Sequence, residues 1–291
     1  MRGLTQRPFA VNVFYPVREQ IDDTQVAAYV ERLAGEAERY GVAAGEPRWT
    51  DDDWQAKLEL VRREQPAVVS FTFGCPEREI VEELRAAGSS VWCTVTSPAE
   101  AEQAASVGVD ALVVQGGEAG GHQGSFHDHP HDPFPLLTLL QLVRRVTDLP
   151  LIAAGGIATA EAIAAVLAAG ASAAQLGTAL LLTPEAGASA AHRQALRGDR
   201  PTKLTRAFTG RRARGIVNRF MLDHDAAAPI AYPEINYVTA PIRAAARASD
   251  DGETINLWAG QAYPLTQERS ASELVAELVH ELARLNPAAI T

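Results

Sequence analysis

The chain has 291 residues, of which 47% are hydrophobic, and a formal net charge of −10. This length and apolar content suit one large or two ordinary folded domains and exclude wholesale disorder. The negative charge argues against a nucleic-acid partner, because phosphate binding depends on clustered lysine and arginine. The sequence shows no apolar run of membrane-spanning length and no secretory signal, so we expect a cytoplasmic protein without membrane contact.

Short apolar segments alternate with segments of helical pattern through the first two thirds of the chain. The pattern predicts six strands, at residues 10–14, 68–73, 90–95, 110–114, 150–154 and 173–176. It predicts helices at residues 22–40, 51–64, 77–87, 97–108, 135–147 and 159–169, and an amphipathic helix at 270–285. The helix at 97–108 has the clearest start, an N-cap Ser97 followed by Pro98. This alternation indicates a parallel sheet, either doubly wound or closed as a barrel.

A glycine-rich segment, residues 115–126, directly follows the predicted strand at 110–114. Glycine allows a ligand to approach the backbone closely and allows positive φ angles. A histidine titrates near neutral pH and can move a proton, and the segment contains His122. We therefore expect a ligand on exposed backbone with His122 as the acid/base group beside it. The alternative is a turn histidine whose ring is satisfied by the backbone.

Two further predicted strands end in glycine, at Gly155-Gly156 and at Gly177-Thr178. Exposed N–H groups of glycine turns attract anions, and the hydroxyl of Thr178 adds a donor. In TIM barrels a phosphate site often forms from the loops after strands seven and eight. We therefore predict a phosphate site here, although tight turns alone would also explain the glycines. A Rossmann unit is disfavoured, because no GxGxxG motif follows the first strand.

Several charged or aromatic residues leave two interpretations open. Residues 127–132 have the composition of a metal cluster, but nothing in this proline-containing loop fixes a tetrahedral geometry, so we expect a polar loop and no metal.

Glu118 could act in acid/base chemistry or order the glycine loop, and Trp258 could line the pocket or only pack. The basic run could attract an anionic substrate or form salt bridges; its members are Arg206, Arg211, Arg212 and Arg214.

Taken together, these segments resemble the FMN-dependent nitronate monooxygenases. The segments that carry the resemblance are residues 8–12, 70–74, 115–126, 153–157, 175–178, 205–211 and 258–261. The Glu-Ala-Gly-Gly-His core is shared with related FMN barrels, including a flavin-dependent enoyl reductase. The segments 205–211 and 258–261 favour the nitronate branch.

The resemblance implies a role for each of the matching residues. His122 matches the active-site histidine that lies over the flavin and interacts with or deprotonates the substrate. The other positions match contacts to the flavin ring, the ribityl chain or the phosphate. The implied cofactor-binding residues are Asn12, Gln115, Gly120, Gly121, Gly155, Gly156, Gln175, Gly177 and Thr178.

The resemblance also implies a TIM barrel with a small inserted domain. Residues 1–182 would form strands three to eight of the barrel, residues 183–254 a helical cap, and residues 255–291 a C-terminal segment whose helix returns to the barrel. Family members carry about two βα units before the strand at 10–14. No such units lie between Met1 and that strand, so we expect an N-terminally incomplete barrel.

The implied activity is the oxidative denitrification of alkyl nitronates, such as propionate 3-nitronate, with O2, giving a carbonyl compound and nitrite. The implied partners are FMN and a small anionic substrate, with a homodimer as the candidate assembly. One alternative is another FMN barrel oxidoreductase, such as an NAD(P)H-dependent enoyl reductase. Another is a truncated flavin- or phosphate-binding barrel without catalytic activity.

Overall fold

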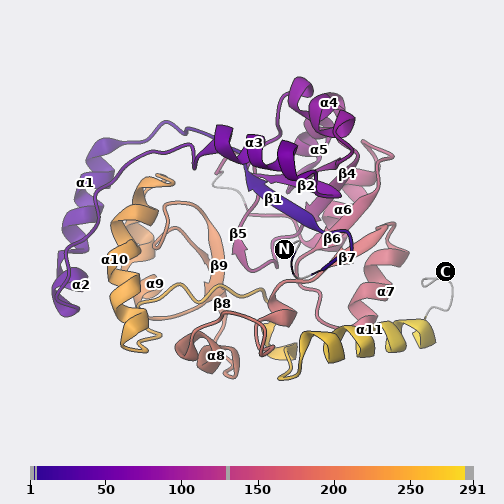
Figure 1. The fold of residues 1–291 in the computed structure, drawn as a ribbon. Helices are drawn as coiled ribbons and strands as arrows, with labels where there is room; N and C mark the ends of the chain where they lie inside the picture. Colours follow the sequence, from indigo (N-terminus) through magenta and orange to yellow (C-terminus); the bar gives the residue numbers. More distant parts are fainter. Residues whose placement is uncertain (1–2, 4, 129–131, 286–291) are drawn as a thin grey trace.

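A curled parallel sheet of six strands, with helices packed on it, forms the frame of the molecule (Figure 1). The computed structural model describes residues 3, 5–128 and 132–285. The sheet has the order β1-β2-β3-β4-β6-β7, and each neighbouring pair is parallel. Its strands are β1 (Ala10–Phe14), β2 (Val68–Thr72), β3 (Ser90–Val95), β4 (Ala111–Gln115), β6 (Leu151–Ala154) and β7 (Ala173–Gln175). All six predicted strands are confirmed, and together they form a half-barrel.

Helices follow the strands, as the alternating pattern predicts. These helices are α3 (Trp54–Glu64), α4 (Arg78–Ala86), α5 (Pro98–Val107), α6 (Leu136–Arg144) and α7 (Ala160–Ala168). The four residues of β6 are all buried, which explains its continuous apolar sequence. The end strands β1 and β7 are largely exposed, and among the described residues each has a strand partner on one side only. The half-barrel is therefore open at both edges.

The start of α5 confirms the predicted N-cap and ties this helix to the glycine loop. The hydroxyl of Ser97 accepts a hydrogen bond from the N–H of Glu100 at 3.2 Å. The buried carboxylate of Glu100 accepts the N–H of Thr96 at 2.6 Å and the N–H of Phe126 at 2.9 Å. One helix start therefore also fixes the end of the segment 115–126.

A second, antiparallel sheet joins the glycine loop to the later part of the chain. It has the order β5-β9-β8, made of β5 (Gly121–His122), β9 (Ala213–Ile216) and β8 (Thr202–Thr205). His122 pairs with Ala213 across this sheet. The segment 183–254, expected to be helical, thus also contains two strands. Its helices are α8 (Ala190–Leu196), α9 (Arg219–His224) and α10 (Glu234–Ala248).

The predicted helix at 22–40 is in fact two helices, α1 (Asp23–Arg32) and α2 (Ala34–Arg39). The break falls at Leu33, and Gly35, whose helix propensity is low, lies two positions later in the first turn of α2. Both helices lie beside α10, away from the large sheet (Figure 1), and Tyr29 and Leu33 share a buried cluster with residues 207–242. The proposed division into barrel, cap and C-terminal segment stays a prediction.

The C-terminal helix α11 (Ala271–Leu285) lies along α7 (Figure 1). Its buried face consists of Leu274, Leu278 and Leu282, at helical spacing, and this face packs on residues of α7. The amphipathic pattern of residues 270–285 therefore predicted the helix and its buried face. In the part of the chain that the structure describes, no helix is long and apolar enough to cross a membrane.

Candidate functional site

A cavity opens at the carboxyl ends of β4, β6 and β7, where ligands of parallel α/β sheets bind. Seven of the nine predicted cofactor-binding residues line it: Gln115, Gly120, Gly155, Gly156, Gln175, Gly177 and Thr178. The backbone of Gly260, from the segment 258–261, completes one wall. The structure thus brings together residues from separate segments of the chain, from Gln115 to Gly260.

The glycines of this cavity serve different purposes. Gly155 and Gly156 have φ angles of 110° and 68°, in the left-handed region that favours glycine. A Cβ on Gly120 would lie 2.4 Å from the backbone nitrogen of Gly260, so this glycine permits close packing of two loops. Gly177 has a φ of −123°, and a Cβ there would meet no atom within 4 Å. Gly177 therefore leaves open space in the cavity.

Gln115 also positions the loop that carries His122. Its side-chain Nε2 donates to the carbonyl of His122 at 3.1 Å, and its Oε1 accepts the N–H of Gly124 at 2.7 Å. Asn12 lies on β1, outside the lining of this cavity, and its Oδ1 accepts hydrogen bonds from Ser70 and Thr72, both at 2.9 Å. Gly121 is also outside the lining, with a φ of 77°.

The imidazole of His122 lies among three aromatic rings. The ring centroids of Phe73, Tyr232 and Trp258 are 5.8, 5.5 and 5.7 Å from its own. Its Nε2 is 2.8 Å from the hydroxyl of Thr209. Trp258 therefore lies at the site rather than only packing elsewhere. Sequence reasoning did not single out Phe73, Tyr232 or Thr209, although Phe73 and Thr209 fall inside segments that carry the family resemblance.

The surroundings of His122 favour its neutral form. Burial, followed by the positive charges of Arg211 and Arg243, lowers the pKa of His122 to about 3, while Asp128 opposes this shift. The guanidinium of Arg211 lies 4.2 Å from the ring centre of Phe73 and donates to the carbonyl of Ser125. At neutral pH the site thus contains an uncharged imidazole near the buried Arg211 and the partly buried Arg243.

The four arginines of the basic run were expected either to attract an anionic substrate or to form salt bridges, and they differ in their contacts. Arg206 and Arg212 bind the buried carboxylate of Asp128, at 2.7 and 3.0 Å, and so form salt bridges. Arg214 donates to the carbonyl of Gly117 at 2.7 Å. Among the members of the run, Arg211 is the one that lines a cavity next to the rings around His122.

Glu118 also has a structural role. The carboxylate of Glu118 accepts the N–H of Leu136 at 3.0 Å, at the start of α6, and not the N–H groups of the glycine loop. Residues 129–131 of the candidate metal cluster lie outside the described residues. Elsewhere, the side chains of Glu36, Asp223 and His224 lie close enough together to hold a metal ion. The carboxylate of Glu36 is already bound by Arg219, at 2.7 Å.

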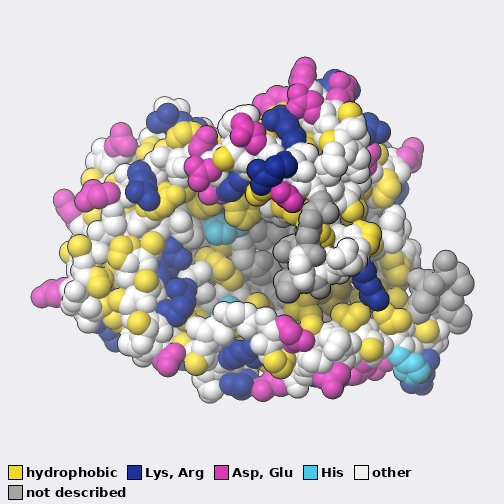
Figure 2. All heavy atoms as spheres, in the orientation of Figure 1, with side chains coloured by type: hydrophobic (Ala, Val, Ile, Leu, Met, Phe, Trp, Pro, Cys, Tyr) yellow, Lys and Arg dark blue, Asp and Glu magenta, His cyan; other side chains and the backbone are white. Residues whose placement is uncertain are grey.

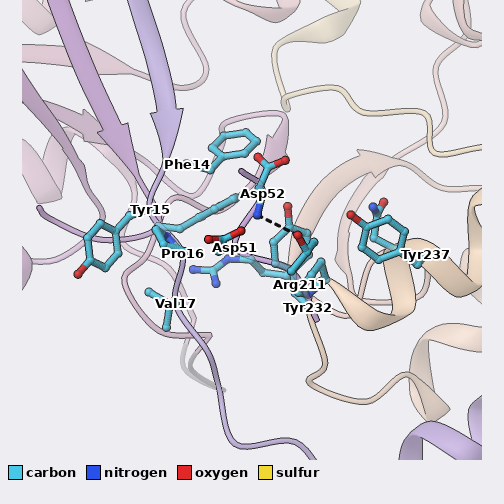
Figure 3. Close-up of a pocket in the computed structure, with 13 residues that line it drawn as sticks. Phe14, Tyr15, Pro16, Val17, Asp51, Asp52, Arg211, Tyr232 and Tyr237 are labelled. Carbon is cyan, nitrogen blue, oxygen red and sulfur yellow. Dashed lines mark hydrogen bonds between the residues drawn. The ribbon is translucent and has the colours of Figure 1, made fainter. Parts of the chain in front are cut away.

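A second cavity lies between the end of β1 and α10 (Figure 3). Arg211 and Tyr232 reach it from one side, and Tyr15 and Asp51 reach it from the other. Phe73 and Tyr232 line this cavity and also contact the His122 ring, so the cavity adjoins the histidine. The space-filling view is hollowed near its centre, and histidine atoms are visible within the hollow (Figure 2).

The chain is similar to proteins of one enzyme family along almost its whole length. The family model described as nitronate monooxygenase matches residues 1–281. A nitronate monooxygenase of Pseudomonas aeruginosa is 40% identical over 97% of this chain and 83% of its own length. One from Paraburkholderia phytofirmans is 39% identical over 97% of this chain and 80% of its own length.

Solved structures agree with this assignment. The nitroalkane oxidase of Streptomyces ansochromogenes, 47% identical, superposes with a TM-score of 0.95 over 99% of this chain and 84% of its own. FabK of Thermotoga maritima, 23% identical, has a TM-score of 0.72 over 98% of this chain and 78% of its own, a likeness of fold. On the family match and the close relatives, this chain belongs to the nitronate monooxygenase family of oxidoreductases.

Proposed function

We propose that the protein is an FMN-dependent enzyme that oxidises alkyl nitronates with O2 to a carbonyl compound and nitrite. The observation that carries the proposal is the link between the glycine cavity and His122. Gln115 lines the cavity and donates to the carbonyl of His122, and the buried Arg211 lies over Phe73, whose ring contacts the same histidine. Membership of the nitronate monooxygenase family supports the reaction class.

The cavity residues fit a flavin mononucleotide. Gly155, Gly156 and Gly177 line the cavity, and the backbone N–H groups of such glycine turns suit a phosphate without lysine. The open space at Gly177 would be filled by a Cβ, as expected where a ligand approaches the backbone. Gln115, Gln175 and Thr178 add polar groups to the same wall. When bound, the flavin supplies the electron acceptor for the substrate and the site of reaction with O2.

The residues of this chain then bind the substrate and handle its proton. A nitronate is a small anion, and the positive charges of Arg211 and Arg243 act on the site. A neutral His122 is a proton acceptor, so it can take the α-proton of a neutral nitroalkane and form the nitronate in place. The rings of Phe73, Tyr232 and Trp258 surround the imidazole and give it apolar neighbours.

The test is a product assay on the flavin-loaded protein in air. With propionate 3-nitronate, we expect O2 consumption together with nitrite and carbonyl formation. Anaerobic bleaching of the flavin by NAD(P)H, without nitrite from nitronates, would instead identify a nicotinamide-dependent reductase. A purified protein that is colourless and takes up no FMN would contradict both activities.

A further inference from the structure

The hydroxyl group of Thr209 lies between the ring of His122 and a backbone carbonyl. Thr209 is 2% exposed, and its Oγ1 lies 2.8 Å from His122 Nε2 and 3.1 Å from the carbonyl oxygen of Arg211. A threonine hydroxyl has one proton and so donates one hydrogen bond. Its second contact must therefore be one in which it accepts.

The two contacts have different requirements. The carbonyl oxygen of Arg211 is only an acceptor, and no other described group donates to it in the contacts of its loop. If the hydroxyl donated to His122 instead, this buried carbonyl would lose its donor, at a cost of about 1–3 kcal/mol. The arrangement that satisfies all three groups has His122 Nε2–H donating to Thr209, and Thr209 donating to the carbonyl.

The backbone on both sides of this contact is fixed. The turn that carries Thr209 is closed by a hydrogen bond of 2.8 Å from Gly210 N–H to the carbonyl of Arg206. Gly210 has a φ of 78°, and a Cβ there would lie 2.1 Å from the carbonyl oxygen of Ala231, so the turn has little freedom. On the other side, β5 pairs with β9, and Gln115 holds the carbonyl of His122. The hydroxyl is thus preorganised to receive the Nε2 proton.

We propose that Thr209 is a positioning residue that keeps neutral His122 in the Nε2–H tautomer, so that Nδ1 is the ring atom available to the substrate. Among the described residues, Nδ1 of His122 makes no hydrogen bond. The substrate half of this inference rests on the proposed function. The tautomer itself does not.

The proton transfer that follows is balanced. The Cα–H bond of a neutral nitroalkane breaks, and a proton moves to Nδ1 of His122. The electron pair of that bond moves into the nitro group, which gives a nitronate and an imidazolium. The Nε2–H of the imidazolium then donates a charge-assisted hydrogen bond to Thr209. Without Thr209, a fraction of His122 would have its proton on Nδ1 and could not accept another there.

The tautomer can be measured without flavin or turnover, by nitrogen NMR of protein labelled with 15N-histidine. The His122→Asn spectrum identifies the His122 signals. In the wild type we expect a protonated Nε2 and an unprotonated Nδ1. Thr209→Val should shift both signals towards a mixture of tautomers, and Thr209→Ser should restore the wild-type pattern. Thr183→Val is the matched control, because Thr183 is also 2% exposed and its hydroxyl donates to a backbone carbonyl, at 2.9 Å.

A protonated Nδ1 in the wild type would overturn the proposal, whether or not the valine variant folds. Signals unchanged in Thr209→Val would overturn it as well. With flavin-loaded enzyme, Thr209→Val should lower kcat/KM for nitroethane about tenfold or more and for preformed ethyl nitronate less than about threefold. Equal losses on both substrates would contradict the positioning role. If the NMR result holds but the wild type oxidises neither substrate, the proposed function has failed and the tautomer assignment stands.

Discussion

At the scale of single residues, the site depends on how its neighbours set the state of His122. A solvated histidine would be partly charged near neutral pH, but burial and the cations Arg211 and Arg243 lower the pKa of His122 to about 3. A histidine beside an anionic ligand can hold the anion as an imidazolium or accept a proton as a neutral base. The surroundings of the ring select the neutral base.

Replacing His122 separates the two substrate forms. His122→Asn should lower kcat/KM for nitroethane by about 10²–10⁴-fold, since no side chain then accepts the α-proton. Ethyl nitronate needs no deprotonation, so its kcat/KM should fall less than about tenfold. Oxygen consumption measures both, with His280→Asn, at an exposed position on α11, as the control. A variant that retained wild-type turnover of nitroethane would remove His122 from the mechanism.

The same histidine should make the fold sensitive to acid. Its pKa is about 3 in the folded state and near 6.5 in the unfolded chain, so only the unfolded state takes up this proton between these values. The free energy of unfolding should therefore fall with pH below 6.5, by up to about 1.4 kcal/mol per pH unit from this group. Urea titrations between pH 7 and pH 4 should show a shallower decline for His122→Asn. Parallel curves for the two proteins would mean that His122 is not held neutral.

At the scale of elements, much of the frame could be predicted and most of the second sheet could not. Strands such as β4 and β6 are runs of mostly buried apolar residues followed by glycine turns, a local signal. In contrast, β5 has two residues inside a glycine loop and forms only because β9 pairs with it. The glycine turns of the cavity were visible in the sequence. Tyr232 and Arg243 were not, because only tertiary packing brings them to His122.

A substitution at Gly177, in the turn after β7, tests the cofactor site without changing the protein's own packing. Gly177 has a negative φ, and an added methyl group would meet no protein atom within 4 Å. Gly177→Ala should therefore keep the wild-type Tm but weaken FMN binding by about tenfold or more, because the methyl group occupies ligand space. Flavin fluorescence titration measures the affinity. Gly187→Ala is the control, since its Cβ also meets nothing and Gly187 lies outside the cavity lining. Equal affinities in both variants would place the flavin elsewhere.

At the scale of the whole molecule, helices α1 and α2 connect the early chain to the segment that covers the site. Their contacts to α9 and α10 include a half-buried ion pair in which Arg219 binds Glu36 at 2.7 Å. This placement was not predicted, because an amphipathic helix specifies that one face is buried but not what covers it. The open edges at β1 and β7 agree with the predicted incomplete barrel.

Breaking the ion pair between Glu36 and Arg219 should destabilise the packing of α2 on α9. The hydrogen bond from Arg219 lowers the pKa of Glu36 below its usual value of 4.5, so the charged pair stabilises the fold above that pH and loses its effect as the pH falls. At pH 7, Glu36→Gln should lower the free energy of unfolding by about 1–3 kcal/mol in urea denaturation. Glu268→Gln, in the exposed pair with Arg197, should change nothing measurable. Equal effects of the two variants would contradict a stabilising role for the Glu36 pair.

The measurement that tests the central claim most directly is the visible absorbance of the FMN-loaded protein during anaerobic mixing with propionate 3-nitronate. The flavin should bleach as the nitronate is oxidised, and its spectrum should return when air is admitted, with nitrite in solution. A flavin that stays oxidised in the presence of the nitronate would contradict the account.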